Sequence, residues 1–139
     1  MPRHAKKYEA AGIDALRLME LIYICRQYRK MKQTLENARA GIVDRPHSAN
    51  IAWRRPDPTG NAAVNVAAMP EARRVRLIEA AAAEVAPHAI ARAILKSACD
   101  DVSYEKLRPR PPCGPNQFYD YRRRFFICLD GKLYADEIR

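Results

Sequence analysis

Residues 114–126 read GPNQFYDYRRRFF, and this stretch decides how the rest of the chain is interpreted. The Gly-Pro pair at its start suits a helix N-terminus, because the N–H group that proline lacks is not needed at the first helical position. Apolar side chains then recur at spacings of three, four and four residues, at Phe118, Tyr121, Phe125 and Leu129. Side chains with this spacing share one face of an α-helix. The stretch therefore predicts an amphipathic helix that begins near Pro115 and buries aromatic residues.

Polar and charged side chains occupy the remaining positions of this predicted helix. Asparagine and glutamine can pair bidentately with adenine, and arginine with guanine, so the helix is typical of one that reads DNA. The candidate DNA-contacting residues on it are Asn116, Gln117, Tyr119, Asp120, Arg122, Arg123 and Arg124, with Arg122 near the edge of the apolar face. The alternative is a helical hairpin whose arginines form only a solvated surface.

The segment that precedes Pro115 predicts the first part of a helix-turn-helix motif. Ser103 suits an N-cap, and residues 104–108 are predicted to form a short helix. Residues 109–114, which read PRPPCG, end that helix because prolines lack an N–H group and clash with the preceding turn. This turn is longer than the three or four residues usual for the motif. Arg108 and Arg110 complete the set of candidate DNA-contacting residues.

The charge of the chain favours a polyanionic partner. Its 139 residues include 25 Lys and Arg against 16 Asp and Glu, for a net charge of +9 and an isoelectric point near 9.7. A positive charge of this size favours nucleic acid first and an anionic membrane surface second. No apolar run approaches the roughly 18 residues of a spanning helix. No apolar segment follows the basic N-terminus, so the N-terminus is not expected to be a signal peptide. We therefore expect a cytoplasmic protein with no membrane partner.

The residue types that carry catalysis or bind metals are not arranged in any known pattern. The four cysteines, at positions 25, 99, 113 and 128, form no C-x-x-C pair, whereas a zinc site needs closely spaced ligands. Cys25, Cys99 and Cys128 lie in apolar helical patterns and are expected in the core. Paired carboxylates, a Ser/His/Asp set and a glycine-rich phosphate loop are also absent from the sequence. We expect no catalytic residues, no metal and no cofactor, and thus no enzyme.

The N-terminal part of the chain predicts one long helix over residues 9–40, with Gly41 as its C-terminal cap. Apolar residues alternate spacings of three and four along it, at Leu21, Ile24, Tyr28, Met31, Leu35 and Ala38. This seam of nearly three heptads must be covered. It packs either on a later helix of the same chain or on a second copy, in a homodimer formed through Leu21, Ile24, Tyr28, Met31 and Leu35.

The rest of the chain predicts an all-α fold with a proline-rich linker. Residues 42–69 contain prolines and no periodicity, and Trp53 in this linker either anchors it on the core or stacks on a base. Two helices are predicted over 70–86 and 87–100, and the Asp-Gly pair at 130–131 is predicted to end the last one. The predicted organisation is a long N-terminal helix (1–41), a linker (42–69), a helical domain that ends in the helix-turn-helix (70–133) and a tail (134–139).

Two segments also carry a resemblance to a known family. Residues 57–63 read DPTGNAA, and residues 118–126 read FYDYRRRFF. With the order of the predicted elements, they make the chain resemble the small phage-encoded late transcriptional regulators of the RinA and ArpU type, whose C-terminal part is similar to region 4 of sigma factors. The resemblance covers most of residues 9–133. It implies phage or prophage origin, binding to a promoter through the helix that begins at Pro115, and contact with host RNA polymerase.

The leading hypothesis is a sequence-specific DNA-binding transcriptional regulator that reads the major groove. An oligomeric DNA-packaging or assembly factor, similar to a small terminase subunit, is the alternative and would bind DNA with little sequence preference. A third possibility is a module that binds RNA or inhibits another protein through the same basic face.

Overall fold

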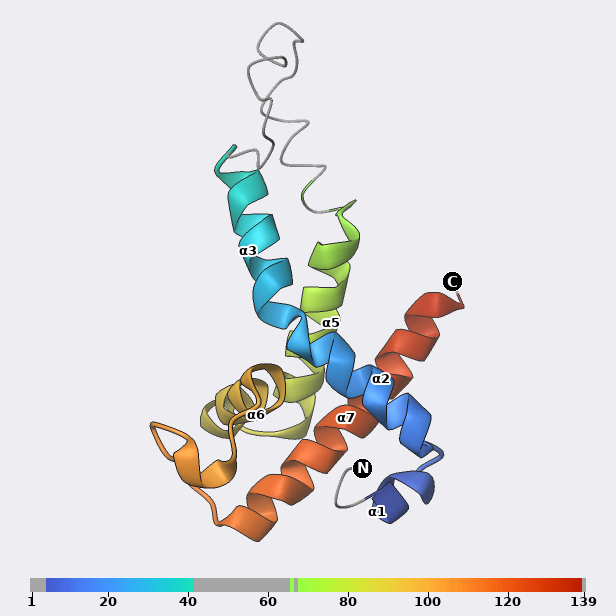
Figure 1. Ribbon diagram of the computed structural model, residues 1–139, viewed down its shortest axis with the longest axis vertical. Helices are drawn as coiled ribbons and strands as arrows, with labels where there is room; N and C mark the ends of the chain where they lie inside the picture. The colour runs from blue at the N-terminus through green and yellow to red at the C-terminus, as the bar shows by residue number, and fades with distance from the viewer. Residues whose placement is uncertain (1–4, 42–65, 67, 139) are drawn as a thin grey trace, which may run out of the picture. The chain divides into compact units, whose positions relative to one another are not determined.

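The computed structural model describes residues 5–41, 66 and 68–138 of the chain, and all its regular elements are helical (Figure 1). The predicted all-α class is therefore confirmed. The chain forms two compact units, of which the larger comprises Met1–Tyr28 with Leu77–Arg139 and the smaller comprises Arg29–Arg76. Most of the predicted linker, including Trp53, lies outside the described residues.

The N-terminal region is not the single helix predicted over residues 9–40. It begins with the short helix α1 (Ala5–Glu9), turns, and continues as α2 (Ala15–Arg26). Gly12 in the turn has a φ of +88°, a left-handed conformation that favours glycine. Asp14 then caps α2, because its carboxylate accepts a hydrogen bond of 2.8 Å from the N–H group of Arg17.

A second interruption separates α2 from α3 (Tyr28–Arg39). The N–H group of Gln27 donates to the carbonyl of Ile24, three residues back, over 3.1 Å. The boundary between the two compact units falls after Tyr28. Gly41, with a φ of +76°, lies in the turn that follows α3, in agreement with its predicted role at the end of the helix.

The apolar seam predicted along this region is covered within a single chain. Leu21 and Tyr28 are buried in the larger unit, and Met31 and Leu35 are buried in the smaller one, whereas Ile24 is half-buried. The hydroxyl of Tyr28 also donates a hydrogen bond of 2.5 Å to a carboxylate oxygen of Glu79. The burial of these four side chains supports intramolecular packing, because covered side chains offer no surface to a second copy, and only Ile24 of the five predicted dimer residues keeps some exposure.

The core of the larger unit is built from α2, α6 (His88–Asp100) and α7 (Pro115–Glu137), which contact one another in pairs. α5 (Pro70–Val85) contributes Ile78, Ala81 and Ala82 to the buried residues of this unit. The helices predicted over 70–86 and 87–100 are therefore confirmed, with Pro87 between them. Cys25 and Cys99 are buried as predicted, while Cys128 is half-buried.

Helix α7 extends beyond the stop predicted at Asp130 and Gly131 and ends at Glu137. Most of the predicted tail is therefore helical. Glycine costs a helix about 1 kcal/mol relative to alanine. Leu133 is only 2% exposed and continues the apolar face of α7, and burial of a leucine contributes about 1.5–3 kcal/mol. Burial of Leu133 thus outweighs the cost of the glycine.

The buried face of α7 differs slightly from the one predicted. Phe118, Phe125 and Leu129 are buried as expected, but Tyr121 is only half-buried and Phe126 is buried in addition. The rings of Phe125 and Phe126 pack edge to face with centroids 5.1 Å apart. The face is therefore rotated toward Phe126, which also contacts Tyr8 of α1 at a centroid distance of 6.3 Å.

Tyr8 is expected to make the stability of the fold depend on pH in alkaline solution. Burial raises the pKa of its phenol above the ordinary value of 10.0, although the charges of Arg122 and Arg123 oppose the rise. The folded chain therefore retains a proton that the unfolded chain loses near pH 10, so this contribution to stability is complete below pH 10 and is lost above it. In urea titrations between about pH 8 and 11, we expect the free energy of unfolding of Tyr8→Phe to fall less steeply above pH 10 than that of the unmodified protein.

The exposed Tyr134 provides the matched control for this prediction. Because Tyr134 is 62% exposed, a Tyr134→Phe variant should keep the full alkaline decline. Parallel curves for Tyr8→Phe and the unmodified protein would show that Tyr8 does not cause it.

Candidate nucleic-acid interface

The connection between α6 and α7 occupies residues 101–114 and differs from the first part of a standard helix-turn-helix. Asp101 ends α6 in a left-handed conformation with a φ of +57°. The predicted helix over residues 104–108 is only the 3₁₀ turn η2 (Tyr104–Lys106). Prolines prevent its extension. The predicted short helix is therefore confirmed only in part, as a 3₁₀ helix of three residues, and a helix-turn-helix of standard geometry is not confirmed.

Tyr104 links this connection to the start of α7 through hydrogen bonds and a ring contact. Its hydroxyl donates a hydrogen bond of 2.5 Å to the carbonyl of Cys113, and its N–H group donates one of 3.1 Å to the hydroxyl of Tyr119. Its ring also packs against Phe118 at a centroid distance of 5.6 Å. Tyr119, predicted to contact DNA, is half-buried and its hydroxyl accepts this hydrogen bond from the connection.

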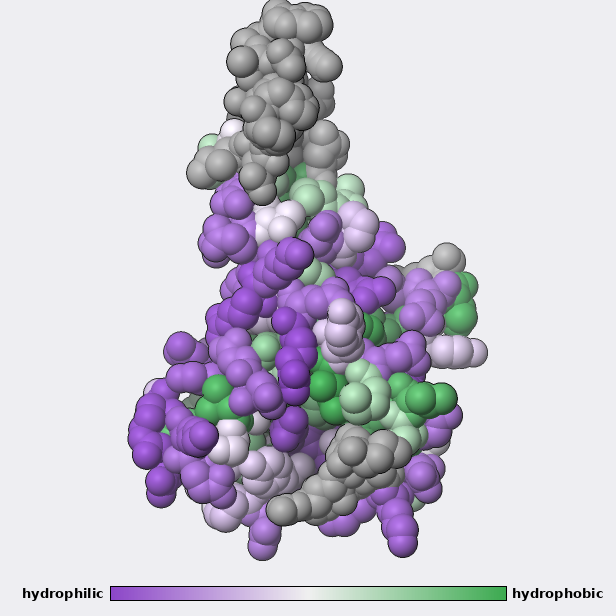
Figure 2. Space-filling view, in the orientation of Figure 1, coloured by the Kyte–Doolittle hydropathy of each residue, from purple (hydrophilic) through white to green (hydrophobic). Residues whose placement is uncertain are grey.

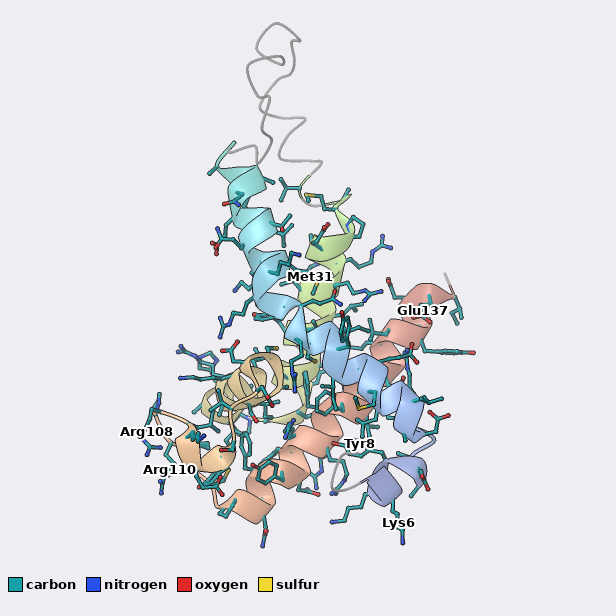
Figure 3. The ribbon with its side chains drawn as sticks, in the orientation of Figure 1. Lys6, Tyr8, Met31, Arg108, Arg110 and Glu137 are labelled. Carbon is teal, nitrogen blue, oxygen red and sulfur yellow. The ribbon has the colours of Figure 1, made fainter. Side chains whose placement is uncertain are left out.

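The outer side of the connection carries several cations. Lys106, Arg108 and Arg110 are exposed, and the amine of Lys96 on α6 reaches the carbonyl of Arg108 at 3.2 Å. Figure 3 shows Arg108 and Arg110 together on the connection. We call this set of four cations, Lys96, Lys106, Arg108 and Arg110, the basic edge. Lys96 and Lys106 were not predicted as contact residues, and no local pattern in the sequence reveals the contact between Lys96 and Arg108, twelve positions apart.

Local contacts orient the two predicted arginines of the basic edge. One terminal nitrogen of Arg108, Nη1, donates to the carbonyls of Glu105 and Leu107, at 3.0 and 2.7 Å. The guanidinium carbon of Arg110 lies 6.0 Å from the centroid of the Tyr104 ring. An arginine has five N–H donors, so both exposed guanidinium groups keep donors that can bind phosphate.

The first turn of α7 presents two amide side chains directly after the basic edge. Asn116 and Gln117 are both exposed, as predicted. Gly114 at the N-cap position makes no side-chain capping bond, and Pro115 occupies the first turn. The unpaired N–H groups at a helix start and the helix dipole favour an anion there. The start of α7 thus combines hydrogen-bonding side chains with a positive electrostatic environment.

The three consecutive arginines of α7 lie in different environments. Asp120 forms ion pairs with Arg123 and, at 3.0 Å, with Arg124. Arg124 is exposed, and its guanidinium carbon lies 5.8 Å from the centroid of the Tyr121 ring. Its spacing from Gln117 is two helical turns, which places both on one face of α7. Arg124 is therefore the arginine of this run that is best placed beside the exposed amides.

Arg122 lies on the packed side of α7. Its guanidinium carbon is 5.6 Å from the centroid of the Phe126 ring and 5.9 Å from that of Tyr119. Its Nε atom is buried, with no hydrogen-bond partner among the described residues. Arg122 and Arg123 also lie near enough to the buried Tyr8 of α1 to oppose the rise in its pKa. Arg122, predicted as a DNA contact, is thus engaged in packing.

Comparison with protein-family models, with curated proteins and with solved structures finds no match. Over the described ranges, no helix is long and apolar enough to cross a membrane. Within the same residues, no group of three or more His, Cys, Asp or Glu side chains could hold a metal ion.

Proposed function

We propose that this protein binds double-stranded DNA and acts as a transcriptional regulator of a phage or prophage. The basic edge would contact phosphates, and the exposed face of the first turns of α7 would enter the major groove. The observation that carries this proposal is that exposed cations at 106, 108 and 110 directly precede the exposed pair Asn116 and Gln117. Phosphate contacts position a protein on the duplex, and side chains in the groove read the sequence.

The proposed division of roles follows the environment of each side chain. Arg124 is exposed and can reach phosphate. Gln117 lies on the same face of the helix and can pair with the edge of an adenine. Contact with host RNA polymerase, which the resemblance to late transcriptional regulators implies, would accompany promoter binding. The packaging alternative needs an oligomerisation surface, and its candidate seam is covered within one chain.

Two substitutions on one face of α7 test these roles. Gln117→Ala should weaken binding to the preferred duplex by about 1–3 kcal/mol and relax the preference at one base pair. Arg124→Ala should weaken binding to all duplexes alike and reduce the salt slope by about 1. Fluorescence anisotropy on a selected and a random duplex, each over a range of salt concentrations, separates the two effects. Equal losses on both duplexes for Gln117→Ala would contradict its role as a base contact.

A further inference from the structure

The large apolar side chains that are exposed among the described residues are concentrated on two helices. They lie on α2 and at the C-terminal end of α7, at Leu16, Met19, Tyr23, Tyr134 and Ile138. On α2 the spacings are three and four residues, and on α7 the spacing is four, so each set shares one helix face. Leu16 is 78% and Tyr23 is 68% exposed. Figure 2 shows hydrophobic colour over α2 and at the end of α7.

An acidic cluster joins these two apolar faces. The helices contact each other, and Nε of Arg17 on α2 donates a hydrogen bond of 2.5 Å to a carboxylate oxygen of Asp130 on α7. The pKa of Arg17 is raised, mainly by this hydrogen bond and further by the negative charges of Asp130, Glu137 and Glu20. Asp130 and Glu20 thus form ion pairs with Arg17, and Glu137 is near enough to act on it electrostatically.

The charge of this region is opposite to that of the chain as a whole. The chain has a net charge of +9, yet Glu20 is exposed over 65% of its side chain and Glu137 is also exposed. Isolated exposed apolar residues need no explanation, but exposed apolar faces on two helices that contact each other, with carboxylates beside them, are typical of a protein-binding surface. We call the five apolar residues, with Glu20, Asp130 and Glu137, the acidic-apolar surface.

We propose that the acidic-apolar surface binds an amphipathic helix of a partner protein, with its apolar face against α2 and α7 and lysine or arginine side chains beside the three carboxylates. Binding of one helix face to an apolar surface is a common mode of peptide recognition. Leu16 to Tyr23 spans about 10 Å along α2, or two turns, which matches the anchors of such a helix. A second copy of this chain fits less well, because a twofold interface would bring identical acidic surfaces together.

The acidic-apolar surface is separate from the proposed DNA-contacting face. Gln117 and Tyr134 are seventeen residues apart on α7, a separation of about 26 Å along the helix. A partner bound near Tyr134 therefore leaves the start of α7 free. This inference does not depend on DNA binding, and it survives if the DNA proposal fails.

A pair of designed peptides tests the proposal on the full-length protein. The first is a fluorescein-labelled helical peptide with leucines along one face and lysines elsewhere, and the second has glutamates in place of the lysines. By fluorescence anisotropy, the lysine peptide should bind and the glutamate peptide should not. Two variants should each weaken binding of the lysine peptide by at least about tenfold: Leu16→Ser, at an exposed position, and the double variant Glu20→Lys/Glu137→Lys. A tenfold loss corresponds to about 1.4 kcal/mol, a common contribution of one interface residue.

Glu36→Lys, a charge reversal at an exposed residue of α3, is the matched control and should bind as the unmodified protein does. Failure of the lysine peptide to bind, or equal binding of both peptides, would overturn the proposal. A concentration-dependent dimer that Leu16→Ser abolishes in sedimentation experiments would also overturn it, since a second copy would then be the occupant.

Discussion

Replacement of Phe118 by alanine is expected to lower the free energy of unfolding by about 3–5 kcal/mol, the usual cost of removing a large aromatic side chain from a core. Phe118 is fully buried at the first turn of α7. Its ring contacts those of Tyr104 and Tyr119, at centroid distances of 5.6 and 5.4 Å. The substitution therefore leaves a cavity where the connection is attached to α7. A loss of this size is a large part of the stability of a small domain.

Urea denaturation measures this effect, and Gln117→Ala is the matched control. Gln117 precedes Phe118 in the same turn but is exposed, so its truncation should change the free energy of unfolding by no more than about 0.5 kcal/mol. Phe118→Ala should also weaken DNA binding under conditions where it is folded, because Phe118 supports the tyrosine that holds the connection. A loss of less than about 1 kcal/mol in stability would show that Phe118 is not part of the core.

The second large effect is expected for the double substitution Arg108→Ala/Arg110→Ala. Each phosphate contact contributes a slope of about −0.9 to the dependence of log affinity on log salt. Loss of two contacts should therefore reduce the slope by about 1.8 and, at about 0.1 M salt, weaken binding to any duplex on the order of 100-fold. Since both side chains are exposed, the free energy of unfolding should change little.

A second double variant, Lys30→Ala/Arg39→Ala, removes the same amount of charge from exposed positions of α3. In fluorescence anisotropy over a salt series, this variant should have nearly the same DNA affinity and the same salt slope as the unmodified protein. An equal loss for both double variants would mean that net charge alone drives binding, and the basic edge would then have no special role.

The sequence predicted the helices whose start or end is marked by a local signal. Pro87 separates α5 from α6, and Gly114 with Pro115 begins α7, as the structure has them. The N-terminal break was missed because the apolar periodicity continues across it, although Gly12 and Asp14 are turn and capping residues. Periodicity reports which side chains are buried, and it does not report whether the backbone is continuous.

The last helix and the connection before it were harder to predict because tertiary contacts determine them. Burial of Leu133 stabilises the part of α7 that follows Gly131. The connection is held by hydrogen bonds from Tyr104 to Cys113 and Tyr119 rather than by a helix of its own. No local pattern reveals such contacts between residues nine and fifteen positions apart.

The candidate site was predicted in part. Asn116, Gln117, Arg108, Arg110 and Arg124 are exposed as expected, since polar residues opposite an apolar face generally are. Arg122, predicted near the edge of the apolar face, packs against aromatic rings, because its long aliphatic stem and planar guanidinium allow such contacts. The role of an arginine at the edge of an apolar face thus depends on its neighbours in space.

The most direct test of the central claim is a selection of bound sequences from random duplex DNA at near-physiological salt, read by sequencing. We expect the unmodified protein to enrich a defined motif, and Gln117→Ala to relax one position of that motif. Binding without enrichment would contradict a sequence reader and favour a packaging or assembly factor. Absence of binding would contradict the DNA-binding proposal itself.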